Sequence, residues 1–102
     1  MKVENIVNSK GNTVANQFII KDTGKITFQS YKSEIATLKD NITDNALTTG
    51  WNILALKGEM WDYSSTTRKY FKQFINEETP FTYENKAQWL KEIENNNNIE
   101  VV

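Results

Sequence analysis

The side chains that most often perform chemistry near neutral pH are missing from this sequence. It contains no histidine and no cysteine, so it offers no imidazole base, thiol nucleophile, zinc site or disulfide. Catalysis would need carboxylates, lysine or hydroxyls, and these residues form no ordered motif. We therefore predict that the chain is not an enzyme, has no catalytic or metal-ligating residues, uses no cofactor and acts by binding.

Neighbouring acidic residues come closest to a catalytic pair. Glu77 with Glu78 and Glu92 with Glu94 fall on or beside predicted helices. At these spacings helical side chains point in different directions, whereas a glycosidase needs carboxylates that face each other across a cleft. Solvated charge is the better interpretation of both pairs.

A predicted helix carries three cations and an amide on one face, Arg68, Lys69, Lys72 and Asn76. A solvated helix face is the default interpretation, and contact with nucleic acid or with an acidic protein patch is the sharper one. Three charges are few for RNA or DNA, and the net charge of −1 creates no long-range attraction for phosphates. The face remains a candidate binding surface for a protein or a nucleic acid.

Polar residues on adjacent predicted strands form the second candidate surface: Asn16, Gln17, Gln29, Ser30 and Tyr31. We expect them on one outer face of the sheet, although any half-solvated antiparallel sheet shows this pattern. A second exposed aromatic beside Tyr31, such as Trp51 or Phe81, would make the face a protein-binding hot spot. Gln29, Tyr31 and Trp51 are therefore the binding residues predicted on the sheet.

The junction before the first helix has a structural and a functional interpretation. Asp62 or Ser64 can satisfy free N–H groups of the first helical turn, with Trp61 as a hydrophobic staple. Alternatively, the helix N-terminus, flanked by Thr66 and Thr67, can bind a phosphate or a carboxylate. Asp62 would repel such an anion, so the structural role is the default.

Alternating apolar residues and turn signals predict the strands that position these surfaces. The clearest strand spans residues 25–31, where Ile26 and Phe28 share a face. Other candidates span residues 3–7, 14–21, 34–39 and 51–57, with a short final strand at 99–102. Residues 40–50 are polar and leave their structure open, with one helical turn at 44–49 as an option.

Two amphipathic helices are predicted after the strands. The first should be capped by Ser64 or Ser65 and end near residues 76–78, before Pro80. Its apolar stripe is formed by Tyr70, Phe71, Phe74 and Ile75.

The second helix spans about residues 86–94. Asn85 and Gln88 have the spacing of a capping box at its start, and its apolar side is formed by Trp89, Leu90 and Ile93. Strands followed by helices predict an α+β fold, with an antiparallel sheet of about four strands, two helices and the option of a short C-terminal strand.

Length and hydropathy set the class of protein. A chain of 102 residues is the size of one domain, which we expect to span the whole sequence. No stretch approaches the roughly 18 apolar residues of a membrane span, and the first eleven residues lack the apolar run of a signal peptide. We predict a cytoplasmic protein that makes no membrane contact.

Three blocks of sequence together resemble a family of small phage and prophage proteins. They comprise Gly11, Asn12, Val14, Ala15, Asn16, Gln17, Phe18 and Ile20; then Phe28, Gln29, Ser30, Tyr31, Ser33, Ile35 and Ala36; then Trp61, Asp62, Tyr63, Ser64, Thr66, Thr67, Lys69, Tyr70, Gln73 and Phe74. The blocks cover about half of the chain, and residues 40–60 form a longer connection than the family usually has. The family supplies no assigned function and no catalytic residue.

The resemblance implies a phage or mobile-element setting, where small proteins commonly modulate host machinery. We predict a phage-encoded inhibitor of a bacterial defence system, with an anti-CRISPR protein as the specific form, that occludes a host protein such as a CRISPR effector or its nucleic-acid complex. The alternatives are a nucleic-acid-binding accessory protein of phage replication or transcription, and a self-assembling phage structural component. The sequence leaves the oligomeric state open.

Overall fold

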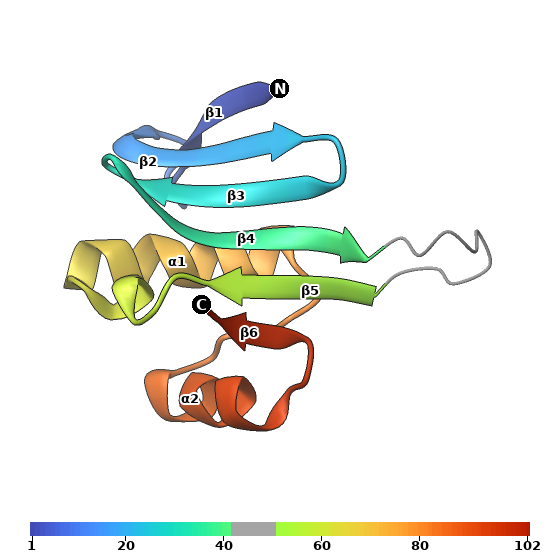
Figure 1. The fold of residues 1–102 in the computed structure, drawn as a ribbon. Helices are drawn as coiled ribbons and strands as arrows, with labels where there is room; N and C mark the ends of the chain where they lie inside the picture. Colours follow the sequence, from blue (N-terminus) through green and yellow to red (C-terminus); the bar gives the residue numbers. More distant parts are fainter. Residues whose placement is uncertain (42–50) are drawn as a thin grey trace.

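Six strands form one sheet, in the order in which they occur along the chain (Figure 1). The computed structural model describes residues 1–41 and 51–102. The strands are β1 (Lys2–Val7), β2 (Thr13–Asp22), β3 (Lys25–Ser30), β4 (Ser33–Asn41), β5 (Trp51–Leu56) and β6 (Ile99–Val101). Strands β1 to β5 pair antiparallel, and β6 pairs parallel with β5.

This arrangement confirms the predicted α+β class, although the sheet has six strands rather than about four. The sheet is larger because the N-terminal strand and the short C-terminal strand both join it, one at each edge. The helical turn suggested for residues 44–49 lies outside the described residues, as does most of the 40–50 segment.

Both predicted helices are present, and local capping residues define where they begin. Helix α1 (Ser65–Glu78) follows the short 3-10 turn η1 (Met60–Asp62), and Ser64 Oγ accepts a hydrogen bond of 3.1 Å from the Thr67 N–H. Helix α2 (Lys86–Asn95) begins after Asn85, whose Oδ1 accepts from the Gln88 N–H at 2.9 Å. Within the described ranges, no helix has the length and apolar character needed to cross a membrane.

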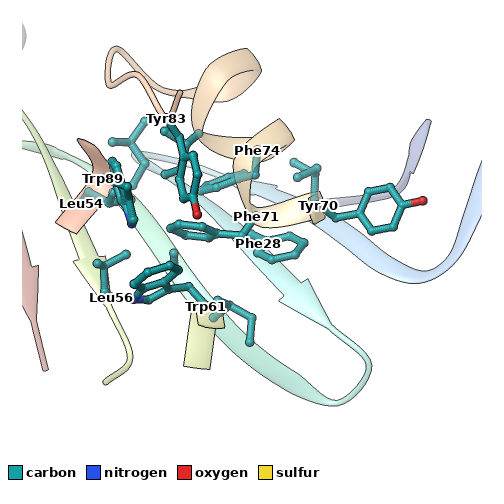
Figure 2. Close-up of a cluster of buried hydrophobic side chains, with 14 of the residues drawn as sticks. Phe28, Leu54, Leu56, Trp61, Tyr70, Phe71, Phe74, Tyr83 and Trp89 are labelled. Carbon is teal, nitrogen blue, oxygen red and sulfur yellow. The ribbon is translucent and has the colours of Figure 1, made fainter. Parts of the chain in front are cut away.

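Helix α1 packs across one face of the sheet, where its apolar stripe meets β3 (Figures 1 and 2). Phe28 of β3 stacks on Phe74 with ring centroids 5.6 Å apart, and its centroid lies 6.3 Å from that of Phe71. All four residues of the predicted stripe are buried. The 3.6-residue period therefore identified the core-facing side of α1 correctly.

A second aromatic group closes the core at the β6 end of the sheet, beside α2 (Figure 2). Tyr83 and Trp89 stack with centroids 5.4 Å apart, and Phe71 meets Trp89 edge-on at 5.6 Å. Trp61, from η1, lies 5.7 Å from Phe71. These contacts join η1 and the segment between the helices to α1 and α2.

The strand pleat places the predicted polar surface differently from our expectation. Gln17 pairs with Ser30, and both side chains point to the α1 side, where Gln17 is 0% and Ser30 4% exposed. The prediction of one outer polar face was therefore wrong for these two residues, because Gln17 shares with Ile19 the face of β2 that α1 covers. The Gln17 amide atoms are buried without a hydrogen-bond partner among the described residues.

Candidate protein-binding surface

The two-residue connection between β3 and β4 consists of Tyr31 and Lys32, and it carries an unusual backbone conformation. Ser30 pairs with Ser33 on either side of it, and Tyr31 has a φ of 56°. Glycine is the preferred residue where the first position of such a turn needs a positive φ. A bulky residue in this region stores roughly 1–3 kcal/mol of strain, so the fold alone would favour glycine over Tyr31.

Neighbouring groups hold Tyr31 in this conformation. Its N–H donates to the Asn16 carbonyl at 2.6 Å, and Gln29 Nε2 donates to the Tyr31 carbonyl at 2.8 Å. Asn16 also has a positive φ, 63°, which asparagine tolerates better than most residues. The backbone is thus fixed on both sides while the Tyr31 side chain remains 57% exposed.

A pocket of about 320 Å³ opens beside this turn, and we call it the tyrosine pocket. It is lined by Ser30, Tyr31, Ser33, Ile35, Met60, Tyr63 and Thr67. Its two exposed residues are tyrosines, since Tyr63, just after η1, is 83% exposed. The lining contains no charged side chain, so the pocket suits an uncharged group of a partner.

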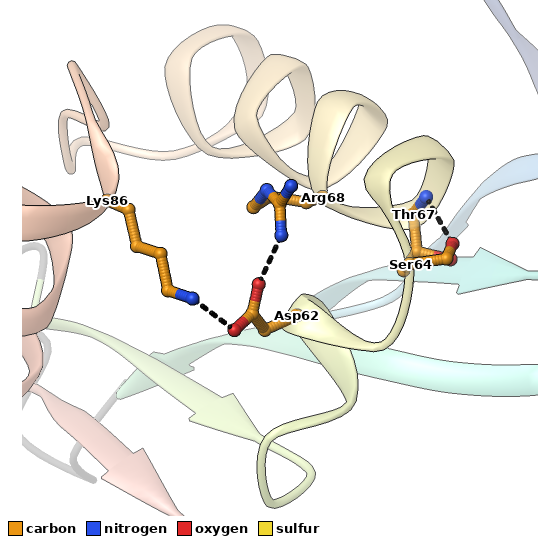
Figure 3. Close-up of polar contacts among 5 residues, drawn as sticks. All are labelled: Asp62, Ser64, Thr67, Arg68 and Lys86. Atoms are coloured by element: carbon orange, nitrogen blue, oxygen red, sulfur yellow. Dashed lines mark hydrogen bonds and ion pairs between the residues drawn. The ribbon is translucent and has the colours of Figure 1, made fainter.

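The hydroxyl groups at the back of the tyrosine pocket already bond to each other. Ser30 Oγ and Thr67 Oγ1 are 3.1 Å apart, and Ser64 Oγ donates to Thr67 Oγ1 at 3.1 Å. Figure 3 shows Ser64 also capping α1 through the Thr67 N–H. Because these hydroxyls have partners, an apolar side chain can enter the pocket without leaving them unsatisfied.

Asp62 links η1 to both helices, and we call this group of contacts the Asp62 clamp (Figure 3). Its Oδ1 accepts from Arg68 at 2.6 Å, and its Oδ2 pairs with Lys86 Nζ at 2.7 Å. Hydrogen bonds from Lys86 and then from Arg68 lower the pKa of the Asp62 carboxyl. Asp62 is therefore an ion-pair partner, and the capping role predicted for Asp62 or Ser64 belongs to Ser64.

The predicted basic face of α1 is largely engaged within the chain. Arg68 joins the Asp62 clamp, while Lys72 Nζ donates to the Glu84 carbonyl at 3.0 Å. Asn76 donates to the Tyr83 carbonyl and accepts from the Tyr83 N–H, both at 2.9 Å. These contacts hold the segment between α1 and α2 against α1.

The remaining predicted binding residues lie in different places. Lys69 is exposed, with Nζ 5.3 Å from the centroid of the neighbouring Tyr70 ring. Phe81 is partly buried against the core, so it does not join Tyr31 as an exposed aromatic. Trp51 begins β5, and its side chain lies outside the described part of the structure. Tyr63 is an exposed aromatic that lines the same pocket as Tyr31, and it was not among the binding residues predicted from the sequence.

The fold is of the α+β class, with α1 packed across one face of the sheet and α2 beside β6. By sequence, the chain belongs to a family of unknown function, DUF8033, whose profile matches residues 1–95. No curated protein and no solved structure matches the chain significantly.

Proposed function

We propose that this protein acts by binding, and that it occludes a surface of another protein through the tyrosine pocket. The observation that carries the proposal is Tyr31, an exposed aromatic on a turn whose backbone favours glycine. Strained residues cluster at functional sites. With 57% of its surface exposed, Tyr31 is available to a partner, and contact with a partner would account for the strain at this position.

The surroundings of Tyr31 support protein recognition. Tyrosine is enriched at interface hot spots because it supplies a large rigid contact area with a polar tip. Tyr31 and Tyr63 line the same uncharged pocket, which includes Ile35 and Met60. An apolar side chain of the partner would fill the pocket between the two rings.

The narrower proposal is a phage-encoded inhibitor of a bacterial defence system in the host cytoplasm. It rests on the resemblance to phage and prophage proteins, and an anti-CRISPR protein is its specific form. The partner would be a CRISPR effector or its nucleic-acid complex, whose surface the tyrosine pocket would occlude.

Affinity capture with matched variants tests the binding proposal. Tagged wild-type protein, Tyr31→Gly, Tyr63→Ala and the control Lys69→Glu would be used to capture proteins from a bacterial host lysate, with and without nuclease, before mass spectrometry. We expect a nuclease-resistant protein that wild type and Lys69→Glu retain. Both tyrosine variants should lose it by about 30-fold, the effect of a hot-spot residue.

Several outcomes would contradict the proposal. Retention of the same partner by both tyrosine variants would exclude the tyrosine pocket as the docking site. Broad recovery that disappears with nuclease would instead favour the nucleic-acid accessory function. A large closed oligomer of the purified protein would favour a structural component.

Phage infection tests the narrower proposal. Bacteria with an active CRISPR system would be challenged with a targeted phage while expressing wild-type protein, Tyr31→Gly or Lys69→Glu. An inhibitor restores plaques with wild type and Lys69→Glu but not with Tyr31→Gly. Unchanged immunity with all three would exclude inhibition of that system while leaving the capture result valid.

A further inference from the structure

The β1 edge of the sheet contains a short, regular and open segment at residues 2–5. The pairing of β1 with β2 is regular from Lys2 to Asn5 and shifts register before Val7. Beyond the shift, Gln73 Nε2 donates to the Val7 carbonyl at 2.6 Å, so α1 covers that part of the edge. Val3 lies in the middle of the open segment and is 55% exposed.

The sheet register shows which peptide groups of β1 face outward. The Tyr31 N–H bonds to the carbonyl of Asn16, so the peptide groups of Asn16 point toward β3. Because this direction alternates along a strand, the even-numbered residues of β2 bond to β3 and the odd-numbered residues bond to β1. Lys2 pairs with Lys21 and Glu4 with Ile19, both odd-numbered. The peptide groups of the alternate β1 residues, including Val3, therefore point away from the sheet.

We propose that β1 pairs antiparallel with β1 of a second copy, centred on Val3, and so joins two sheets into one continuous sheet. A two-fold axis at Val3 places each copy's outward peptide groups opposite those of the other. Closed two-fold dimers are the commonest oligomers. The proposal goes beyond the proposed function, because no residue lining the tyrosine pocket belongs to β1.

The charges that would face each other across the two-fold axis favour an axis at Val3 over an axis at a neighbouring residue. An axis at Lys2 would set two lysines opposite each other, and an axis at Glu4 would set two glutamates opposite each other; both arrangements are unfavourable. An axis at Asn5 places no opposite charges together. An axis at Val3 sets Lys2 opposite Glu4 of the second copy, and it does so twice by symmetry.

The charged side chains are available for this contact. The Lys2 side chain is 73% exposed and that of Glu4 37% exposed. Within the chain, Glu4 contacts Lys21 at 3.2 Å and Lys2 at 3.6 Å, and the longer contact can be exchanged for Lys2 of the second copy. Lysine on an edge strand usually prevents strand pairing, but here each lysine would face a glutamate.

Val3 adds an apolar contact at the centre of the interface. Two copies of Val3 would lie opposite each other across the axis on the sheet face that α1 does not cover. The short segment makes a small interface, and small interfaces give weak and concentration-dependent association. The dimer should therefore appear on concentration rather than persist at every dilution.

Charge-reversal variants test the register through mixing. Sedimentation velocity over a concentration series would compare the full-length wild-type chain, Lys2→Glu, Glu4→Lys and an equimolar mixture of the two variants. Each single variant should weaken the dimer by about tenfold, because both symmetric pairs become repulsive. The mixture should restore wild-type association, since both pairs in a mixed dimer are again Lys with Glu.

Matched controls separate the register from net charge. Lys91→Glu and Glu94→Lys make the same charge changes at exposed positions on α2 and should leave association unchanged. Val3→Pro removes an outward N–H and should give a folded monomer, with folding checked by circular dichroism. A wild-type monomer at every concentration, reversals without effect or a mixture that stays monomeric would each overturn the proposal. None of these results would bear on partner capture through the tyrosine pocket.

Discussion

The tyrosine pocket and the Asp62 clamp both lie at the start of α1, but they relate to the fold in opposite ways. The clamp uses charged side chains with partners inside the chain and an ordinary backbone. The pocket exposes two aromatic rings, one on a strained turn, with no charged residue in its lining. The charged residues of the clamp are explained by stability, whereas the backbone at Tyr31 would favour glycine over tyrosine.

Removal of the clamp carboxylate should have the largest effect on stability. In Asp62→Ala, Arg68 and Lys86 lose their shared partner, and we expect the free energy of unfolding to fall by about 2 kcal/mol. Urea unfolding monitored by tryptophan fluorescence measures this value. Glu94→Ala removes an exposed carboxylate on α2 and serves as the control. An equal loss in both variants would contradict the role of the clamp.

The contact between Asn76 and Tyr83 should come next in size. Asn76→Ala removes two hydrogen bonds to the Tyr83 backbone, so stability should fall by about 1.5 kcal/mol. The same unfolding assay applies, with Asn97→Ala at an exposed position as the control. Unchanged stability in Asn76→Ala would return this face of α1 to the list of candidate binding surfaces.

Tyr31→Gly should change stability in the opposite direction. Glycine adopts the positive φ of this position without strain, so stability should rise by about 1 kcal/mol. Lys32→Gly, at the other position of the turn, is a matched control, because Lys32 does not have a positive φ and should gain nothing. A loss of stability in Tyr31→Gly would show that the Tyr31 side chain serves the fold.

Acid should reduce the stability that the Asp62 clamp contributes, by less than the loss expected for Asp62→Ala. The folded-state pKa of Asp62 is lowered, so its contribution is present above the unfolded pKa of about 3.9 and is lost as pH falls through the folded value. The stability difference between wild type and Asp62→Asn should therefore shrink by about 1 kcal/mol between neutral pH and pH of about 2. A constant difference across this range would contradict the assignment.

Local signals in the sequence predicted the helices well. The apolar stripe of α1, the cap at Ser64 and the cap at Asn85 depend on residues within a few positions of each other. Two details differ. Gln88 Oε1 accepts from the Glu84 N–H at 2.8 Å, rather than from that of Asn85 as in a capping box. Leu90, predicted on the apolar side of α2, is 47% exposed. The strands were also found, although fewer were expected to join one sheet.

Contacts between distant parts of the chain were the ones that the sequence did not reveal. Alternation in β2 separates its two faces but does not say which face α1 will cover, so Gln17 was assigned to the wrong side. The clamp joins Asp62, which precedes α1 in the sequence, to Lys86, which follows it. Tyr63 became a candidate only when η1 placed it beside the β3–β4 turn. Phage origin and the inhibitor function remain predictions.

The order of elements along the chain also determines when the core can form during synthesis. Strands β1 to β5 pair with their sequence neighbours, so the meander can assemble one hairpin at a time from contacts that are close in sequence. Among the described residues, those that pack on the apolar face of that meander from η1, α1, α2 and the segment between the helices all follow it in the sequence. A nascent chain that has emerged as far as Leu56 therefore carries an uncovered sheet with Phe28 and Leu54 exposed, the kind of species that aggregates or recruits chaperones. Cooperative folding must wait until the helices have left the ribosome.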